Sequence, residues 1–313
     1  MSAQNNPDSS EYYSFVNKVK HFIPYNMIRL LVYLQILLLL GIYTCQASHI
    51  NKVDRDVLHT FWQYATKHQL SRKNINERIP IIACFFLDTP YKSNTLNVTQ
   101  KELPVINLHE LDCVTFVENV LALSLLSEYN DNAIGTFVNN IISLRYRNSE
   151  IEDYTSRLHY SSDWLFEMEK QHLLKDITQF AGGICFHPEV CFMSKNYDRY
   201  PPLKADLKLL KKIKTIETEI NKRTYYYIPK NKINTACNKI KAGDVILITT
   251  NIKGLDVSHL GFAYKQQGKT YLLHASSTGK RVMLSEQPLQ DYMEGIKSQS
   301  GIMVGRITQN IPE

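Results

Sequence analysis

The sequence lacks the closely spaced cysteine and histidine pairs that hold structural metal ions. It contains 6 Cys and 10 His in 313 residues, yet it has no CxxC motif. The nearest approach is GGICFH at residues 182–187, with one thiol and one imidazole. Zinc sites usually take four such ligands at regular spacings. We therefore expect neither a metal site nor a cofactor.

A clustered basic face is also missing. Lys and Arg exceed Asp and Glu by only 36 to 30, which gives a net charge of +6. A protein that binds nucleic acid concentrates its positive charge on one face, whereas the Lys-rich run at 204–214 is typical of a solvated helix face. We expect no nucleic-acid partner. With 44% hydrophobic and 21% charged residues, the chain has the composition of a globular protein with a substantial core.

No apolar run is long enough to span a bilayer comfortably. The run at residues 30–43 has about 14 residues, the length of the apolar core of a signal peptide. We expect residues 1–47 to be a signal that exports the protein to the periplasm or the medium, with cleavage after Ala47. If it is not cleaved, residues 27–43 would anchor the protein and would be its only contact with a membrane. A lipoprotein signal ending at Cys45 is a third reading, which the two preceding residues match poorly.

Internal repeats and low-complexity linkers are absent too, so we expect one catalytic domain over residues 48–313. Its first half has the apolar spacing of helices, and its last third consists of short β-rich runs between Gly-containing turns. Helices followed by an antiparallel sheet form an α+β fold. The helices are expected at 53–70, from 113 onward, and at 137–144, 163–174 and 203–220. The strands are expected at 225–228, 245–249, 259–264, 270–274, 281–284 and 302–304.

Cys113 has the features of a nucleophile. It opens the apolar helical run that starts at residue 113, and Asp112 before it is a good helix cap. The positive end of a helix and a nearby imidazole both lower the pKa of a thiol. His259 begins one predicted strand and His274 ends the next, so neighbouring antiparallel strands can present both imidazoles together. A single buried Cys or His is more often structural, and none of the three residues alone would indicate a site.

The predicted exported chain has five cysteines, which is an odd number. At least one thiol therefore stays free unless chains are cross-linked. Cys185 and Cys191 are close enough in sequence to pair, but the spacing does not decide whether they do.

The motifs around these three residues resemble the NlpC-type cell-wall peptidases, a papain-like superfamily. Within it, the sequence is most similar to the N-acetylmuramoyl-L-alanine amidases. The shared motifs, in chain order, are LDTPY at 87–91, DCVTFVE at 112–118, RYR at 145–147, SRLHYSSDW at 156–164, FMS at 192–194, GLDVSH at 254–259 and HASS at 274–277. They extend over residues 79–306, nearly all of the predicted exported chain.

The resemblance implies a role for each central residue. Cys113 would attack the amide carbonyl, His259 would accept its proton and pass it to the leaving amine, and His274 would orient His259. The backbone N–H of Cys113 and the phenol of Tyr91 would stabilise the oxyanion. Asp88 departs from the amidase pattern, which has a small residue, often Gly, before the Thr-Pro-Tyr motif.

A longer stretch separates Cys113 from His259 than in compact members of the superfamily. We expect residues 132–223 to be a helical insertion that walls the cleft. The residues expected to contact substrate, from this insertion and from the GLDVSH motif, are Ser156, Arg157, His159, Tyr160, Trp164, Asp256 and Ser258. An equally good reading makes Arg157 and Trp164 an ordinary helix anchor. Glu118 either faces the cleft or forms a salt bridge on its helix.

The predicted function is hydrolysis of the amide between N-acetylmuramic acid and L-alanine, through an acyl-enzyme, in peptidoglycan or its muropeptides. The choice of bond follows from the resemblance alone. Three alternatives stay open. One is a stem-peptide endopeptidase that cuts between D-glutamate and the diamino acid, another is acyl transfer to an amine, and the third is a non-catalytic cell-wall binding protein.

Overall fold

The computed structural model describes residues 50–97 and 101–308. These residues belong to one compact unit, His49–Glu313. The predicted signal at 1–47 lies outside the described residues. Within residues 50–97 and 101–308, no helix is both long and apolar enough to cross a membrane.

The helical part of the fold starts at Asn51, which caps the first described helix by accepting a hydrogen bond from the Asp54 N–H. The helices are α3 (Lys52–Lys67), α4 (Ile75–Phe85), α5 (Cys113–Ser124), α6 (Ile134–Arg145), α7 (Ser161–Lys170), α8 (Phe192–Lys195), α9 (Pro201–Ala205), α10 (Leu207–Asn221), α11 (Ile233–Ala236) and α12 (Leu289–Glu294). The helix predicted from Cys113 is confirmed at its first residue.

One eight-stranded sheet forms the other part of the fold. Its strands are β1 (Leu174–Asp176), β2 (Ile184–Phe186), β3 (Tyr225–Pro229), β4 (Val245–Thr250), β5 (Val257–Gln266), β6 (Lys269–Ser276), β7 (Arg281–Leu284) and β8 (Gln299–Ile307). The strand order is β2-β3-β8-β4-β5-β6-β7, and β1 pairs with β8. All strand pairs are antiparallel. The predicted α+β plan with an antiparallel sheet is confirmed.

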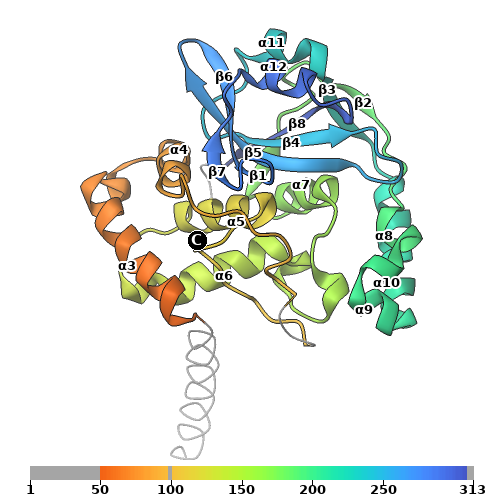
Figure 1. The fold of residues 1–313 in the computed structure, drawn as a ribbon, viewed down its shortest axis with the longest axis horizontal. Coiled ribbons are helices and arrows are strands. Elements are labelled where there is room, and N and C mark those ends of the chain that lie inside the picture. The colour runs from red at the N-terminus through yellow and green to blue at the C-terminus, as the bar shows by residue number, and fades with distance from the viewer. Residues whose placement is uncertain (1–49, 98–100, 309–313) are drawn as a thin grey trace, which may run out of the picture. The chain divides into compact units, whose positions relative to one another are not determined.

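Both faces of the sheet are covered, as Figure 1 shows with α5 and α6 on one side and α11 and α12 on the other. β4 is buried on both of its faces, since all of its residues are buried. Side chains alternate between the faces of a strand. Val245 and Leu247 belong to the core shared with α5, and Ile246 and Ile248 belong to the core shared with α12. The sheet is therefore the middle of three layers.

The prediction that residues 132–223 are entirely a helical insertion is wrong in two places. It contributes β1 and β2 to the central sheet, where Leu174 pairs with Ile307 of β8 and Ile184 pairs with Tyr227 of β3. Both strands have only three residues, which is too short to produce a recognisable alternation of apolar side chains.

The helices within this region also differ in detail from those predicted. α7 ends at Lys170 instead of 174, since the chain turns there to enter β1. The helix predicted over 203–220 is divided at Asp206. This residue is extended and caps α10 by accepting a hydrogen bond from the Lys208 N–H.

Candidate active site

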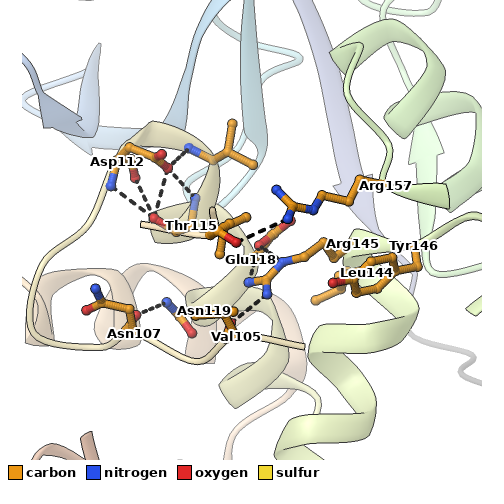
Figure 2. Close-up of polar contacts among 12 residues, drawn as sticks. Val105, Asn107, Asp112, Thr115, Glu118, Asn119, Leu144, Arg145, Tyr146 and Arg157 are labelled. Atoms are coloured by element: carbon orange, nitrogen blue, oxygen red, sulfur yellow. Dashed lines mark hydrogen bonds and ion pairs between the residues drawn. The ribbon is translucent and has the colours of Figure 1, made fainter. Parts of the chain in front are cut away.

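Cys113 is the first residue of α5 because Asp112 caps the helix. The Asp112 carboxylate accepts hydrogen bonds from the Val114 and Thr115 N–H groups at 3.1 and 2.8 Å. Thr115 returns the interaction, since its hydroxyl oxygen accepts from the Asp112 N–H at 2.9 Å. Figure 2 shows this reciprocal arrangement at the start of the helix. The prediction that Asp112 is a cap is confirmed, and its carboxylate is thereby occupied.

The Cys113 thiol is protonated in the resting protein. Burial raises its pKa to about 12, and the Asp112 carboxylate acts in the same direction. The backbone N–H groups of Leu260, Cys113 and Val114 lie against the sulfur and oppose this rise. The residue is nevertheless partly exposed, so a substrate can reach it. The helix end does not convert the thiol to a thiolate here, because burial outweighs the N–H groups.

The sheet opens at the point where it meets the thiol. The pairing of β5 with β6 begins at Phe262 and Leu273, and the part of β5 before Phe262 has no partner on that side. The Ala263 N–H donates to Asp244 and so points toward β4. Because N–H directions alternate along a strand, the Leu260 N–H points into the gap beside β6. There it meets the sulfur of Cys113, which places the thiol beside the residue that follows His259.

His259 and His274 form a hydrogen-bonded pair. Nε2 of His259 lies 2.6 Å from Nδ1 of His274, and the two rings are nearly perpendicular, at 85°. Gly261 makes this approach possible. A Cβ atom on Gly261 would lie only 2.9 Å from Cβ of His274 and 2.7 Å from the Leu273 carbonyl oxygen. Side chains at 259, 261 and 274 therefore share one face of the sheet, and the glycine leaves room for the second imidazole.

Both imidazoles are neutral at physiological pH. Burial lowers the pKa of His259 to about 4. Burial and the neighbouring His259 lower the pKa of His274 to about 3. A neutral imidazole has one nitrogen that can accept a proton, so the pair is ready to act as a base.

Two tyrosines flank the thiol. Tyr91 is held by backbone hydrogen bonds from its N–H to Lys280 and from the Leu111 N–H to Pro90, which fixes it beside the start of α5. Burial raises the pKa of Tyr91, and the Asp112 carboxylate and the Cys113 sulfur, once it is ionised, add to the rise. Of the four residues predicted to be catalytic, His259 and His274 are in contact, the Cys113 sulfur meets the N–H of the residue after His259, and Tyr91 is close enough to Cys113 to be affected by its charge when the thiol ionises.

Tyr292 is the second phenol, and it was not predicted from the sequence. Its ring contacts the ring of His274 edge-on, with 5.5 Å between centroids. Burial raises the pKa of Tyr292, and the Cys113 sulfur, once it is ionised, adds to the rise. Tyr292 lies on α12, a helix of six residues. The apolar pair Leu289 and Met293, four residues apart and both fully buried, is the signal that could have revealed this helix.

The backbone conformation at Asp88 explains why the amidase pattern has a small residue at this position. Its φ angle is +67°, a left-handed conformation that glycine adopts without strain and that Asp tolerates better than most residues. This explains the small residue expected before the Thr-Pro-Tyr motif. The Asp88 N–H donates to Val282 at 2.9 Å, so the turn that carries Tyr91 keeps its connection to β7.

Three of the residues predicted to contact substrate are inside the protein. Tyr160, Trp164 and Asp256 are 2%, 4% and 1% exposed. Trp164 donates from Nε1 to the Leu144 carbonyl at 2.8 Å, and the Asp256 carboxylate accepts from the Ser162 N–H at 2.7 Å, where it caps α7. Tyr160 donates to Glu217 and accepts from the Met193 N–H. The prediction that these three side chains bind substrate is wrong, because their polar atoms hold helices together.

The remaining predicted contacts are also engaged within the protein, except one. Arg157 forms a bidentate pair with Glu102, at 2.5 and 2.9 Å. Ser156 donates to the Asp153 carbonyl at 2.7 Å, and His159 is 2.8 Å from the Tyr154 carbonyl through Nε2. These contacts favour the reading of this segment as an anchor. Ser258 is different, since it is exposed on β5 next to His259, and it stays a prediction as a substrate contact.

Glu118 is a structural residue of α5. It is 3% exposed and accepts hydrogen bonds from Nε and Nη2 of Arg145 at 2.8 and 2.7 Å. Arg145 also donates to the Val105 carbonyl at 2.6 Å, as Figure 2 shows. Of the two readings of Glu118, the salt bridge is confirmed. The pair ties α5, which carries the thiol, to α6.

The Cys185 and Cys191 thiols are both free, so the pairing left open by the sequence does not form in this structure. The Cys185 sulfur lies 3.1 Å from Nε2 of His187. Among residues 50–97 and 101–308, no cluster of three or more His, Cys, Asp or Glu side chains is arranged to hold a metal ion.

The chain is similar to several solved structures. An N-acetylmuramoyl-L-alanine amidase from Bacteroides uniformis is 35% identical, and the match covers 75% of this chain and 99% of that one with a TM-score of 0.72. A protein from Bacteroides fragilis, provisionally named a xylanase, is 38% identical over 72% of this chain and 99% of its own, with a TM-score of 0.69. A protein from Legionella pneumophila is 24% identical, covers 78% and 92%, and has a TM-score of 0.57. That last likeness shows the fold alone.

A comparison with curated proteins gave no match. The model of the AmiA-like family, described as N-acetylmuramoyl-L-alanine amidase-like, matches residues 81–302. This range contains Tyr91, Cys113, His259, His274 and Tyr292, and it includes most of the described chain. The chain therefore belongs to the AmiA-like family of N-acetylmuramoyl-L-alanine amidase-like proteins.

Proposed function

We propose that this protein is a cysteine amidase that hydrolyses the bond between N-acetylmuramic acid and L-alanine in peptidoglycan or its fragments. One observation carries the chemistry. The Cys113 sulfur, at the start of α5, lies against the N–H of Leu260, and the preceding residue, His259, is hydrogen-bonded to His274. Family membership supports the choice of bond.

The resting site holds a neutral thiol and a neutral imidazole, because burial raises the pKa of Cys113 and lowers that of His259. Attack therefore proceeds by general-base catalysis. As the sulfur bonds to the carbonyl carbon, His259 takes the thiol proton. Its Nε2 is occupied by His274, so Nδ1 is the nitrogen that receives the proton.

Attack converts the carbonyl into a tetrahedral oxyanion. The backbone N–H of Cys113 and the phenol of Tyr91 would be the donors that stabilise this charge, as the resemblance implies, and removal of one such donor costs about 10²–10³ in rate. Protonated His259 then gives its proton to the leaving amine nitrogen. The C–N bond breaks and a thioester on Cys113 remains.

Water resolves the thioester. His259, again neutral, removes a proton from a water molecule that attacks the thioester carbonyl, and the sulfur leaves and is reprotonated. His274 accepts the Nε2–H of His259 through Nδ1 in this scheme, which requires the proton of His274 to be on Nε2. The arrangement of helix, thiol and paired imidazoles is the one we propose to share with the papain-like NlpC-type enzymes.

The sequence at 1–47 supports a further part of the proposal. An apolar run of signal-peptide length would bring the protein to the periplasm or outside the cell, where peptidoglycan is found. Sequencing the mature N-terminus tests the expected cleavage after Ala47, and an intact N-terminus in a membrane fraction would favour the anchor.

The test is digestion of a defined muropeptide, with products identified by mass spectrometry. A free aminosugar and an intact peptide that begins with L-alanine are expected. A shortened stem peptide would identify an endopeptidase instead, and products joined to an added amine would identify acyl transfer.

Variants test the nucleophile. Cys113→Ala should lower kcat by at least about 10⁴-fold, and a thiol alkylator should inactivate the protein, while EDTA should have no effect. Cys185→Ala is the matched control, because that thiol is exposed and lies outside the site. Activity that survives in Cys113→Ala, or that EDTA abolishes, would contradict the cysteine mechanism.

A further inference from the structure

A pocket of about 510 Å³ adjoins the histidine pair. His274 forms part of its wall, and Tyr292 forms another part. These residues connect the pocket to the proposed reacting groups, since His274 is bonded to His259 and the ring of Tyr292 contacts the ring of His274. A substrate bound at the thiol therefore has this pocket beside it.

The lining of the pocket mixes apolar side chains, such as Met283 and Ile296, with polar ones, and its charged side chains are all of one sign. Ser276, Thr278 and Gln287 contribute hydroxyl and amide groups. Glu286 and Asp291 contribute two carboxylates, both exposed. Neither carboxylate forms an ion pair or a hydrogen bond within the described part of the chain, so their charges are not neutralised by the protein.

No Lys or Arg side chain is among the described residues that line this pocket. Lys280 and Lys297 follow lining residues in the sequence, but they do not line the pocket themselves. Two carboxylates facing the same space repel an anion and attract a cation, and hydroxyl and amide groups suit an uncharged polar group.

We propose that this pocket is a charge-selective subsite, which takes an uncharged, hydroxyl- or amide-bearing group or a cationic one and excludes anions. The inference rests on the proposed amidase function and extends it, because it states which parts of a muropeptide can lie beside His274. An aminosugar and a neutral or amino-bearing part of the stem peptide share the required chemistry. A phosphorylated sugar and a free stem carboxylate do not have it.

Binding measurements separate these sources. The protein for the test is Cys113→Ala, which binds substrate without cleaving it, and the readout is Kd by calorimetry. The first pair of ligands is a muropeptide and the same muropeptide phosphorylated on the sugar 6-hydroxyl. The second pair has the α-carboxylate of the second stem residue either amidated or free.

In at least one pair the anionic ligand should bind more weakly. The ratio of the Kd of the anionic ligand to that of its uncharged partner should fall by about three- to tenfold when Glu286→Gln and Asp291→Asn are added. This is the size expected for two partly solvated carboxylates. The pair that responds identifies the group in the pocket. Glu294→Gln is the matched control, because Glu294 is an exposed residue of the same helix that does not line the pocket.

The subsite would be overturned if replacing the two carboxylates left the ratio of Kd values unchanged in both ligand pairs, or if no ligand bound. Failure of the amidase function has a different signature, since it would appear as intact muropeptide after incubation with the wild-type protein. The subsite is therefore tested by binding to Cys113→Ala proteins, and the amidase function is tested by digestion with the wild-type protein.

Discussion

Nε2 of His259 lies 2.6 Å from Nδ1 of His274, so the second imidazole occupies one of the two ring nitrogens of the first. Nδ1 of His259 has no hydrogen bond to another described residue. The contact holds the ring in place. In the proposed mechanism the other nitrogen receives the thiol proton, and His274 is a positioning residue that acts through His259.

The role of His274 is tested by two replacements. His274→Leu removes the acceptor for His259 and should lower kcat by about 10²–10⁴-fold, because His259 then loses its orientation and its tautomer. His274→Asn offers a carbonyl oxygen near the position of Nδ1 and should retain activity within about tenfold of the wild type. Steady-state kinetics on a muropeptide give both values. Equal losses in the two variants would mean that the ring only fills space.

The pH dependence of kcat/KM follows from the neutral base. His259 accepts a proton only above its own pKa, which burial lowers to about 4. Activity should therefore be nearly constant from pH 7 down to about pH 5.5 and should fall below about pH 5, whereas an unperturbed imidazole would lose activity near pH 6.5. A pH–rate profile in buffers of constant ionic strength distinguishes the two. A midpoint near 6.5 would show that His259 is solvated in the active form.

Asp112 has two effects that a single pair of variants separates. Its carboxylate caps α5 and raises the pKa of Cys113. Asp112→Asn keeps a capping oxygen but removes the charge, so the thiol pKa should fall and alkylation at pH 8 should become faster with little loss of stability. Asp112→Ala should also speed alkylation but cost about 1 kcal/mol of folding free energy. Iodoacetamide kinetics and urea unfolding measure the two effects, and slower alkylation in Asp112→Asn would contradict the electrostatic role.

The buried pair of Glu118 and Arg145 should be essential for stability. Arg145→Met leaves the Glu118 carboxylate buried without its partner and should cost about 3–5 kcal/mol, whereas the double variant with Glu118→Leu should recover part of this loss. Urea unfolding provides the free energies. If the double variant is no more stable than Arg145→Met, the carboxylate is not the source of the penalty.

Much of the fold could be predicted from local patterns. The strands at 245–249 and 281–284 have enough β-branched and aliphatic residues to be recognised, and they lie within or coincide with β4 and β7. The start of α5 was predicted from Asp112 and the apolar residues that follow. β1 and β2 were missed because three-residue strands exist only through their pairing with β8 and β3.

The predicted site residues also divide into those that the sequence placed correctly and those that it did not. Cys113, His259 and His274 stand within motifs, and their roles come from the resemblance. The structure shows that the two imidazoles are in contact and that the Cys113 sulfur meets the N–H of Leu260. Tyr160, Trp164 and Asp256 stand within motifs too, yet they are buried. A motif in one sequence does not show whether its polar residues face a cleft or the core.

The sequence by itself determined the chemical groups and the local elements that carry them: a thiol at a helix start and two imidazoles on successive strands. Only the tertiary structure decided their protonation states and their neighbours. The pKa values of the thiol and the imidazoles depend on burial by distant segments, and Tyr292 reaches His274 only because α12 packs on the face of the sheet opposite α5.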